Sequence, residues 1–241
     1  MRYKFKDFIP NKNQQEAIMH PLAPLMILAS AGTGKTATII HRIVHMVTNK
    51  HIDPSSILTI TYTEKAAQEL KDRIKMLIDI DNNSINVTTF HGLCLKIVRE
   101  FGQKKNDYAL IKNDELAYKI LEKFDDLGPF KSREFKKNPL QAITQSFLPF
   151  LDRLHDELLT LDGVSKRQLI YDEEEMNYQL EDLIRFYPIV QDMKKSANRL
   201  DYGDMILSAH QLLSSNDNIL SKVQNKYRHL IICLLYTSDA A

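Results

Sequence analysis

The stretch LMILASAGTGKTATIIHRI, residues 25–43, decides the fold of this chain. Its apolar start, Leu25–Leu28, predicts a buried strand, and the small residues of Ala29–Gly34 predict a tight loop. From Lys35 onward, apolar residues recur at helical spacing, at Ile39, Ile40, Ile43, Val44 and Val47. A strand, a small-residue loop and a helix that opens on Gly-Lys-Thr are the pattern of a phosphate-binding loop.

The chemistry of this loop suits a triphosphate. Small residues let backbone N–H groups converge on one anion, and a helix N-terminus adds unpaired donors and a positive dipole. The Lys35 ammonium can reach the terminal phosphates, and the Thr36 hydroxyl can ligate Mg²⁺. The strict pattern begins with glycine where this chain has Ala29, and a ligand-free strand-to-helix turn is the alternative. The predicted cofactor-binding residues are Ala29, Ser30, Ala31, Gly32, Thr33, Gly34, Lys35 and Thr36, with Lys35 and Thr36 as catalytic residues and Thr36 as metal ligand.

Composition narrows the class of protein. The 241 residues are 44% hydrophobic and 26% charged, which is an ordinary globular balance. A net charge of +1 does not indicate nucleic acid, so a polyanion would have to bind a local patch. The two cysteines, Cys94 and Cys233, have no metal or redox spacing and favour a reduced, cytoplasmic compartment. The charged N-terminus lacks a signal core, and no apolar run approaches the roughly 20 residues of a membrane span.

Strands and helices alternate through residues 24–101. A short helix is expected at 11–19, capped by Asn11 and ended by Pro21. The β-rich run at 57–62 is followed by a helix at 64–78 that Thr63 can cap, then by a strand at 85–89 and a helix at 90–101. Such alternation predicts a parallel sheet, whose ligands bind at the carboxyl ends of its strands.

The composition changes at about residue 102. Residues 113–215 predict helices and no strand, with a capping box at 172–175 and a helix that Asp201 starts. Residues 230–232 predict a strand that returns to the sheet. The expected division is therefore an α/β domain with the phosphate-binding loop at 1–101, a helical insertion at 102–215, a return to the first domain at 216–232, and a tail at 233–241 that is expected to be non-native.

The order of the motifs resembles the N-terminal half of UvrD/Rep/PcrA-like superfamily 1 DNA helicases. The resemblance covers about residues 8–232. Its segments are Asn11–Ile18 (similar to the Q motif), Ala29–Thr36 (motif I, where alanine often replaces the first glycine), Leu58–Ala67 (motif Ia), Val87–Cys94 (motif Ib) and Leu200–Ile206 (similar to a Leu-Asp-Phe-Asp-Asp-Leu signature).

The resemblance implies a fold, cofactors and partners. The fold would be an α/β, RecA-like parallel sheet of a P-loop NTPase with an inserted all-helical subdomain. ATP and Mg²⁺ would be the cofactors, and Gln14 would hydrogen-bond adenine instead of being a solvated helix residue. Single-stranded DNA and junctions of single- and double-stranded DNA would be the partners, with a second RecA-like domain, missing here, in cis. The implied DNA-binding residues are Tyr62, Thr63, Phe90 and His91.

Purely structural roles are the alternative for several of these side chains. Tyr62 and Phe90 can equally be core aromatics, and His91 can be a helix-start histidine. Cys94 is expected in the core. Asp201 and Asp204 are expected to be helix-start residues and not catalytic ones.

Two positions depart from the family pattern. Many members have arginine, close to adenine, where this chain has Ala37. After the strand at 230–232 the family continues with Asp-Glu, which holds Mg²⁺ and orients the attacking water. This chain has Cys233 and Leu234 there. The run at 233–241 resembles translated sequencing-adapter read-through, so we expect the native frame to end near residue 232.

The resemblance thus implies the N-terminal part of an ATP-dependent 3′–5′ DNA helicase or translocase that acts in DNA repair or replication. This part alone is expected to bind ATP weakly and to hydrolyse it negligibly. The alternatives are the motor subunit of a RecB/AddA-like helicase–nuclease and a catalytically dead nucleotide- or DNA-binding module. A small-molecule P-loop kinase is disfavoured, because motifs Ia and Ib have no role in one.

Overall fold

The computed structural model describes residues 8–30, 32–78, 84–102, 108–159 and 174–233. The chain separates into two compact units, one formed by Met1–Leu93 with Asn216–Ala241 and the other by Cys94–Ser215. The expected domain boundaries at residues 101 and 215 stay a prediction. Among the described residues, no helix is long and apolar enough to cross a membrane.

The first unit is an α/β structure with a small parallel sheet. Its elements are α1 (Lys12–Met19), α2 (Lys35–Asn49), the turn η1 (Pro54–Ser56), β1 (Ile57–Thr61), α3 (Glu64–Leu77), β2 (Asn86–Thr89), α12 (Asp217–Lys226) and β5 (His229–Ile232). The sheet order is β2-β1-β5, and both pairings are parallel. The expected strands at 57–62, 85–89 and 230–232 are thereby confirmed, and their carboxyl ends share one edge.

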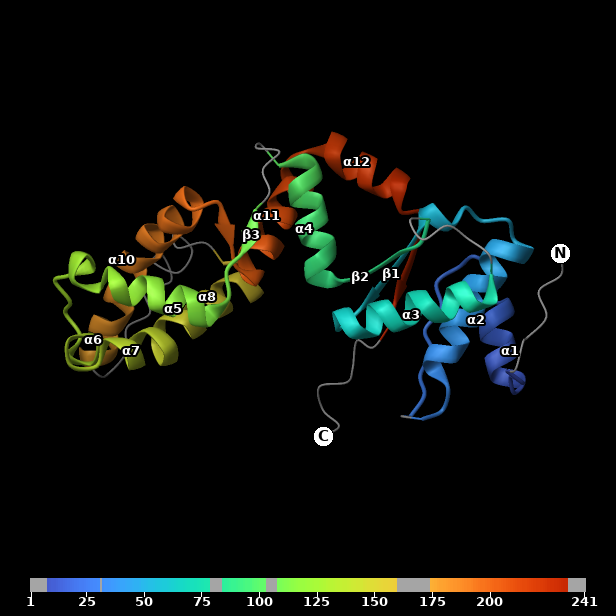
Figure 1. Cartoon of the computed structure of the whole chain (residues 1–241), viewed down its shortest axis with the longest axis horizontal. Coiled ribbons are helices and arrows are strands. Elements are labelled where there is room, and N and C mark those ends of the chain that lie inside the picture. The colour runs from blue at the N-terminus through green and yellow to red at the C-terminus, as the bar shows by residue number, and fades with distance from the viewer. Residues whose placement is uncertain (1–7, 31, 79–83, 103–107, 160–173, 234–241) are drawn as a thin grey trace. The chain divides into compact units, whose positions relative to one another are not determined.

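Apolar side chains of α2 and α3 form the core of this unit against the sheet. Ile43 and Val44 of α2 meet Leu70 and Ile74 of α3 and Val87 of β2, all almost fully buried. Figure 1 shows α1 beside α2, which agrees with the contacts between those helices. This packing holds the first turn of α2 near the strand ends, where a sheet of this kind binds ligands.

The prediction of a buried strand at Leu25–Leu28 is wrong. The segment has no strand geometry, and Met26 and Leu28 are 77% and 80% exposed. A strand needs a neighbour for its backbone hydrogen bonds, and no described residue pairs with this segment. On β5, which pairs only with β1 among the described strands, Leu230 is also more than half exposed. The apolar pattern predicted burial, but burial requires a partner element, and this segment has none among the described residues.

Helix starts follow the local rules. The Asn11 side chain accepts from the Gln14 N–H, and the Gln14 side chain accepts from the Asn11 N–H, which is a complete capping box. Thr63 caps α3 by accepting from the Ala66 N–H at 3.1 Å. Both helices begin within one residue of the expected positions.

The second unit is mainly helical. The chain enters it along α4 (Phe90–Phe101), and its other elements are β3 (Ala109–Leu110), α5 (Asn113–Glu122), η2 (Phe124–Leu127), α6 (Arg133–Lys137), α7 (Pro139–Ala142), η3 (Ile143–Phe147), α8 (Leu148–Asp156), α10 (Glu174–Ser196), β4 (Arg199–Leu200) and α11 (Tyr202–Ser215). Phenylalanines that meet the ring of Phe186 edge-on fill its core.

Two expectations for this unit need comment. The prediction that residues 113–215 contain no strand is wrong at one short element, because β4 pairs in parallel with β3 over two residues. Pairs this short carry no periodic signal in the sequence. The expected capping box at 172–175 begins outside the described residues, and the helix that follows it is α10. Cys94 is 5% exposed, which confirms it as a core residue, and burial raises the pKa of its thiol to about 11.

Candidate nucleotide and DNA site

The predicted phosphate loop curls through two left-handed glycines. Gly32 and Gly34 have φ angles of 75° and 85°, a region that favours glycine because it has no Cβ. Gly34 is the N-cap of α2, and its carbonyl accepts from the Thr38 N–H at 2.9 Å. Lys35 and Thr36 therefore occupy the first turn of the helix, where backbone N–H groups lack intrahelical acceptors. Ala31 lies outside the described residues.

The Lys35 side chain folds back over the phosphate loop. It donates to the carbonyls of Ala29 and Ser30, the latter at 3.3 Å. Within the described part of the chain, no carboxylate forms an ion pair with it, and the residue is partly exposed. The positive charge thus has only carbonyl dipoles as internal partners, which suits a lysine that binds an external anion.

Gln14 connects α1 to the phosphate loop. Its Nε2 donates to the Thr33 carbonyl at 3.0 Å, while its Oε1 serves the capping box. A Cβ on Gly34 would lie 3.1 Å from the same Nε2, so the loop and the glutamine are closely packed. Gln14 is thus not simply a solvated helix residue, and its contact with adenine stays a prediction.

The carboxyl end of β5 reaches the start of α2. The Cys233 N–H donates to the Ile60 carbonyl of β1 at 2.8 Å, which continues the pairing beyond β5. Burial raises the pKa of the Cys233 thiol, against smaller lowering effects from the nearby Lys35 charge and a hydrogen bond with the Thr36 side chain. A thiol therefore lies beside Thr36 at the position where the family pattern has an aspartate.

Arg42, which sequence reasoning missed, fixes α1 against α2. Its buried guanidinium donates to the carbonyls of Ala17, His20 and Pro21 at 2.8, 3.0 and 3.1 Å. The Ala17 carbonyl is in the last turn of α1, where carbonyls have no intrahelical donor, and His20 and Pro21 follow the helix directly. The only sequence signal was a charged residue among the apolar positions of α2. Arg42 holds the helix that carries Gln14 in place against α2.

The predicted DNA-binding residues follow the ends of two adjacent strands. Thr61 and Thr89 are register partners, and Tyr62 and Phe90 directly follow them. Tyr62 is 77% and Phe90 50% exposed. Core packing, the alternative interpretation for both aromatics, is thereby wrong. Thr63 caps α3, and His91 is half-buried with its ring edge toward Phe90 at 6.4 Å between centroids.

A second polar cluster lies buried in the helical unit. The Lys194 ammonium lies 2.5 Å from an Asp201 oxygen and 2.7 Å from an Asp204 oxygen. Asp201 and Asp204 also accept from each other's backbone N–H, which confirms them as helix-start residues of α11. His155 packs against them and is 1% exposed.

The charges of this cluster neutralise one another and have a structural role. Burial pushes the pKa of Asp201 up, but the Lys194 ammonium and hydrogen bonds outweigh it and hold that pKa below its usual value. Burial and the Asp201 charge raise the pKa of Asp204. Although the distances among His155, Asp201 and Asp204 would allow a metal ion, the Lys194 ammonium already lies between the two carboxylates.

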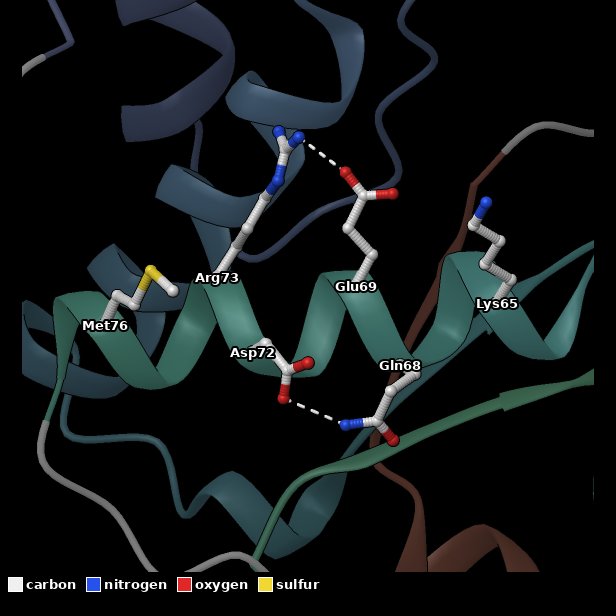
Figure 2. Close-up of a pocket in the computed structure, with 6 residues that line it drawn as sticks. All are labelled: Lys65, Gln68, Glu69, Asp72, Arg73 and Met76. Carbon is white, nitrogen blue, oxygen red and sulfur yellow. Dashed lines mark hydrogen bonds and ion pairs between the residues drawn. The ribbon is translucent and has the colours of Figure 1, made fainter.

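A shallow hollow on the outer face of α3 is solvated helix surface. Figure 2 shows Arg73 pointing toward Glu69, and Gln68 toward Asp72, with which it forms a 2.9 Å hydrogen bond. These polar groups satisfy one another at helical spacing, and none of them is a predicted site residue. The residues that line the hollow are Lys65, Gln68, Glu69, Asp72, Arg73 and Met76.

Comparison with known proteins decides the family. The sequence profile of the UvrD/REP helicase N-terminal domain matches residues 10–232. The chain belongs to the UvrD/REP helicase family. Its relatives include a "Probable DNA helicase II homolog" of Rickettsia conorii, 30% identical over 94% of this chain and 33% of the relative. The "ATP-dependent DNA helicase PcrA" of Bacillus subtilis is 28% identical over 91% of this chain and 28% of its own length.

The family assignment confirms the resemblance seen in the motifs. The chain spans about a third of the length of these curated relatives. The family match ends at residue 232, one residue before Cys233 replaces the expected aspartate.

Proposed function

We propose that this chain is the N-terminal, ATP-binding part of an ATP-dependent DNA helicase that moves 3′ to 5′ on single-stranded DNA. The observation that carries the proposal is the phosphate loop at the strand ends. Lys35 opens α2 there without a carboxylate partner among the described residues, and the ends of β1, β2 and β5 lie at the same edge. The division into a RecA-like domain and an inserted helical subdomain, and the action in repair or replication in the cytoplasm, belong to this proposal.

The residues of the loop fit a nucleotide better than they fit its metal. Backbone N–H groups of the α2 start and the Lys35 ammonium are donors for β- and γ-phosphate oxygens. The Thr36 hydroxyl is an oxygen ligand of the type that Mg²⁺ prefers. The neighbouring group is the Cys233 thiol, a poor ligand for a hard cation, so the protein supplies only part of a magnesium site.

Hydrolysis of ATP by this chain is therefore expected to be negligible. A residue that orients the attacking water is a required part of phosphoryl transfer in P-loop enzymes. Cys233 and Leu234 occupy the positions of the family's Asp-Glu pair, and neither side chain can orient a water as a carboxylate does. A phosphate-release assay with saturating single-stranded DNA measures this. Stimulated turnover at about 1 s⁻¹ or faster, an ordinary enzyme rate, would contradict the expectation.

The DNA contact predicts a second effect. An exposed aromatic ring stacks on any base with about 1–3 kcal/mol, which gives grip without sequence choice. Replacing Tyr62 or Phe90 by alanine is expected to weaken binding of a fluorescein-labelled oligothymidylate by about tenfold each. Fluorescence anisotropy measures the affinity.

A matched control exists for this experiment. Met76 is as exposed as Tyr62, at 77%, but lies on the outer face of α3. Met76→Ala should leave the affinity unchanged. Equal affinities of wild type, Tyr62→Ala and Phe90→Ala would refute the DNA track.

The thiol beside Thr36 favours one second candidate, a nucleotide- or DNA-binding module that does not hydrolyse ATP. The two candidates differ in whether residues 233–241 are native, and we propose that they are not. The genomic reading frame downstream of codon 232 tests this. An Asp-Glu pair in that frame supports the helicase, whereas native Cys233 and Leu234 codons support the binding module.

A further inference from the structure

A buried hydroxyl joins the starts of two helices at the strand ends. The Thr89 Oγ1, at the end of β2, donates to a Glu64 carboxylate oxygen at 2.7 Å. The same oxygen of Thr89 accepts from the Gly92 N–H at 3.0 Å. Glu64 is the first residue of α3, and Gly92 lies in the first turn of α4. The Thr89 hydroxyl therefore ties the start of α3, which follows β1, to the start of α4, which follows β2 directly.

The tie lies directly beside the two exposed aromatics. Thr61 pairs with Thr89 in the parallel register, so Tyr62 and Phe90 leave the sheet at equivalent positions on neighbouring strands. Such strands are about 4.8 Å apart, which places the two aromatic residues next to each other. Glu64 follows Tyr62 by two residues, and Thr89 precedes Phe90 by one. The hydrogen bond therefore joins the two segments that carry the aromatic rings.

The groups around this hydrogen bond are closely packed. A Cβ at Gly92 would lie 2.3 Å from the Thr88 Oγ1, 3.1 Å from the Thr89 Oγ1 and 3.5 Å from the Glu64 carboxylate. Only glycine leaves room for both threonine hydroxyls at this point. The Glu64 carboxylate is also at the N-terminus of α3, where the helix dipole stabilises a negative charge.

We propose that Glu64 is a positioning residue for single-stranded DNA: through Thr89 it holds the starts of α3 and α4 at a fixed spacing, so that Tyr62 and Phe90 bind neighbouring bases as a pair. The inference rests on the proposed DNA track. Its physical basis is preorganisation, because segments already held in the binding geometry lose less conformational freedom when a base stacks. A charge-assisted hydrogen bond is the stronger kind for this purpose.

The charge and the hydrogen bond of Glu64 have opposite effects on DNA. A carboxylate near a DNA backbone repels phosphates, so its removal alone strengthens binding. Glutamine keeps an oxygen that accepts from Thr89 and has no charge, whereas alanine removes both. The pair Glu64→Gln and Glu64→Ala therefore separates positioning from electrostatics.

The test uses the full chain and the labelled oligothymidylate, read by anisotropy. Glu64→Ala and Thr89→Val are each expected to weaken binding about fivefold, and the double variant no further, because both remove the hydrogen bond between Glu64 and Thr89. Glu64→Gln keeps the hydrogen bond and should bind at least as tightly as wild type. Thr89→Ser also keeps the hydrogen bond and should bind about half as tightly as wild type. Glu69→Ala is the matched control: it removes an exposed carboxylate from α3 whose partner is Arg73, and it should not weaken binding.

Two further readouts exclude a merely structural role. The melting temperatures of Glu64→Ala and Glu64→Gln, measured by circular dichroism, should stay close to that of wild type, whereas Thr89→Val also removes the acceptor of the Gly92 N–H and should melt at a lower temperature. A double-mutant cycle between Tyr62→Ala and Phe90→Ala should show coupling in wild type that disappears in the Glu64→Ala background. A Glu64→Ala chain that binds as wild type does, or a Glu64→Gln chain that loses as much affinity as Glu64→Ala, overturns the inference. If the inference alone is wrong, wild type still binds and Tyr62→Ala still weakens binding; if wild type does not bind, the proposed function fails as well.

Discussion

Replacing Lys35 by alanine is expected to weaken binding of a fluorescent ATP analogue by about 100-fold, which corresponds to about 3 kcal/mol. The ammonium is the only side-chain cation placed on the phosphate loop among the described residues, and its internal partners are the carbonyls of Ala29 and Ser30. Losing it removes charge-assisted hydrogen bonds to the terminal phosphates while the backbone donors of α2 remain. Equilibrium titration followed by fluorescence measures the affinity.

Lys65 provides the control for this variant. It is an exposed lysine on the outer face of α3, in the same unit, and its replacement by alanine removes the same charge from the protein. Lys65→Ala should bind the analogue as wild type does. If Lys35→Ala and Lys65→Ala bound with equal affinity, the loop would not be the nucleotide site, and the helicase proposal would lose its main support.

Replacing Lys194 by methionine is expected to lower the free energy of unfolding by about 3–5 kcal/mol. The methionine keeps the length and apolar stem of the side chain but leaves Asp201 and Asp204 buried without a counter-charge. Both carboxylates are at most 8% exposed, so water cannot replace the ammonium. Urea unfolding followed by far-UV circular dichroism measures the loss, since this unit contributes many of the helices.

The adjacent lysine makes a direct comparison possible. Lys195 is exposed on the same helix, and Lys195→Met should change stability by less than about 0.5 kcal/mol. Adding Asp201→Asn and Asp204→Asn to Lys194→Met should recover part of the loss, because the uncompensated charges disappear. A Lys194→Met chain as stable as Lys195→Met would show that the cluster does not stabilise the fold.

Much of the first unit was predictable because its signals are local. The Asn11 and Thr63 caps and the glycines of the phosphate loop act within three or four residues of chain. Short β-rich runs placed β1, β2 and β5, and the rule for parallel sheets placed their ends at one edge. The exposure of Tyr62 and Phe90 was not predictable, since their apolar character was equally consistent with the core.

Other parts of the site depend on residues that are distant in sequence. Arg42 binds carbonyls more than 20 residues away, and Glu64 meets Thr89 across 25 residues. The Leu25–Leu28 segment shows the same limit, because its apolar run indicates that it needs a partner and does not say which one. Family resemblance supplied roles for Gln14, Lys35 and Thr36, whereas the contacts of Gln14 with Thr33 and of Thr36 with Cys233 came from the fold.

By itself, the sequence determined the phosphate loop, the helix starts and the strands of the sheet, because hydrogen bonds between near neighbours and side-chain periodicity specify them. Only the tertiary structure decided that Arg42 anchors α1, that Glu64 joins the starts of α3 and α4 beside the aromatics, and that Lys194 neutralises two buried aspartates. Each of these depends on a charged group reaching a partner that chain folding brings close. The energy of such a contact is set by burial and geometry, which no short stretch of residues encodes.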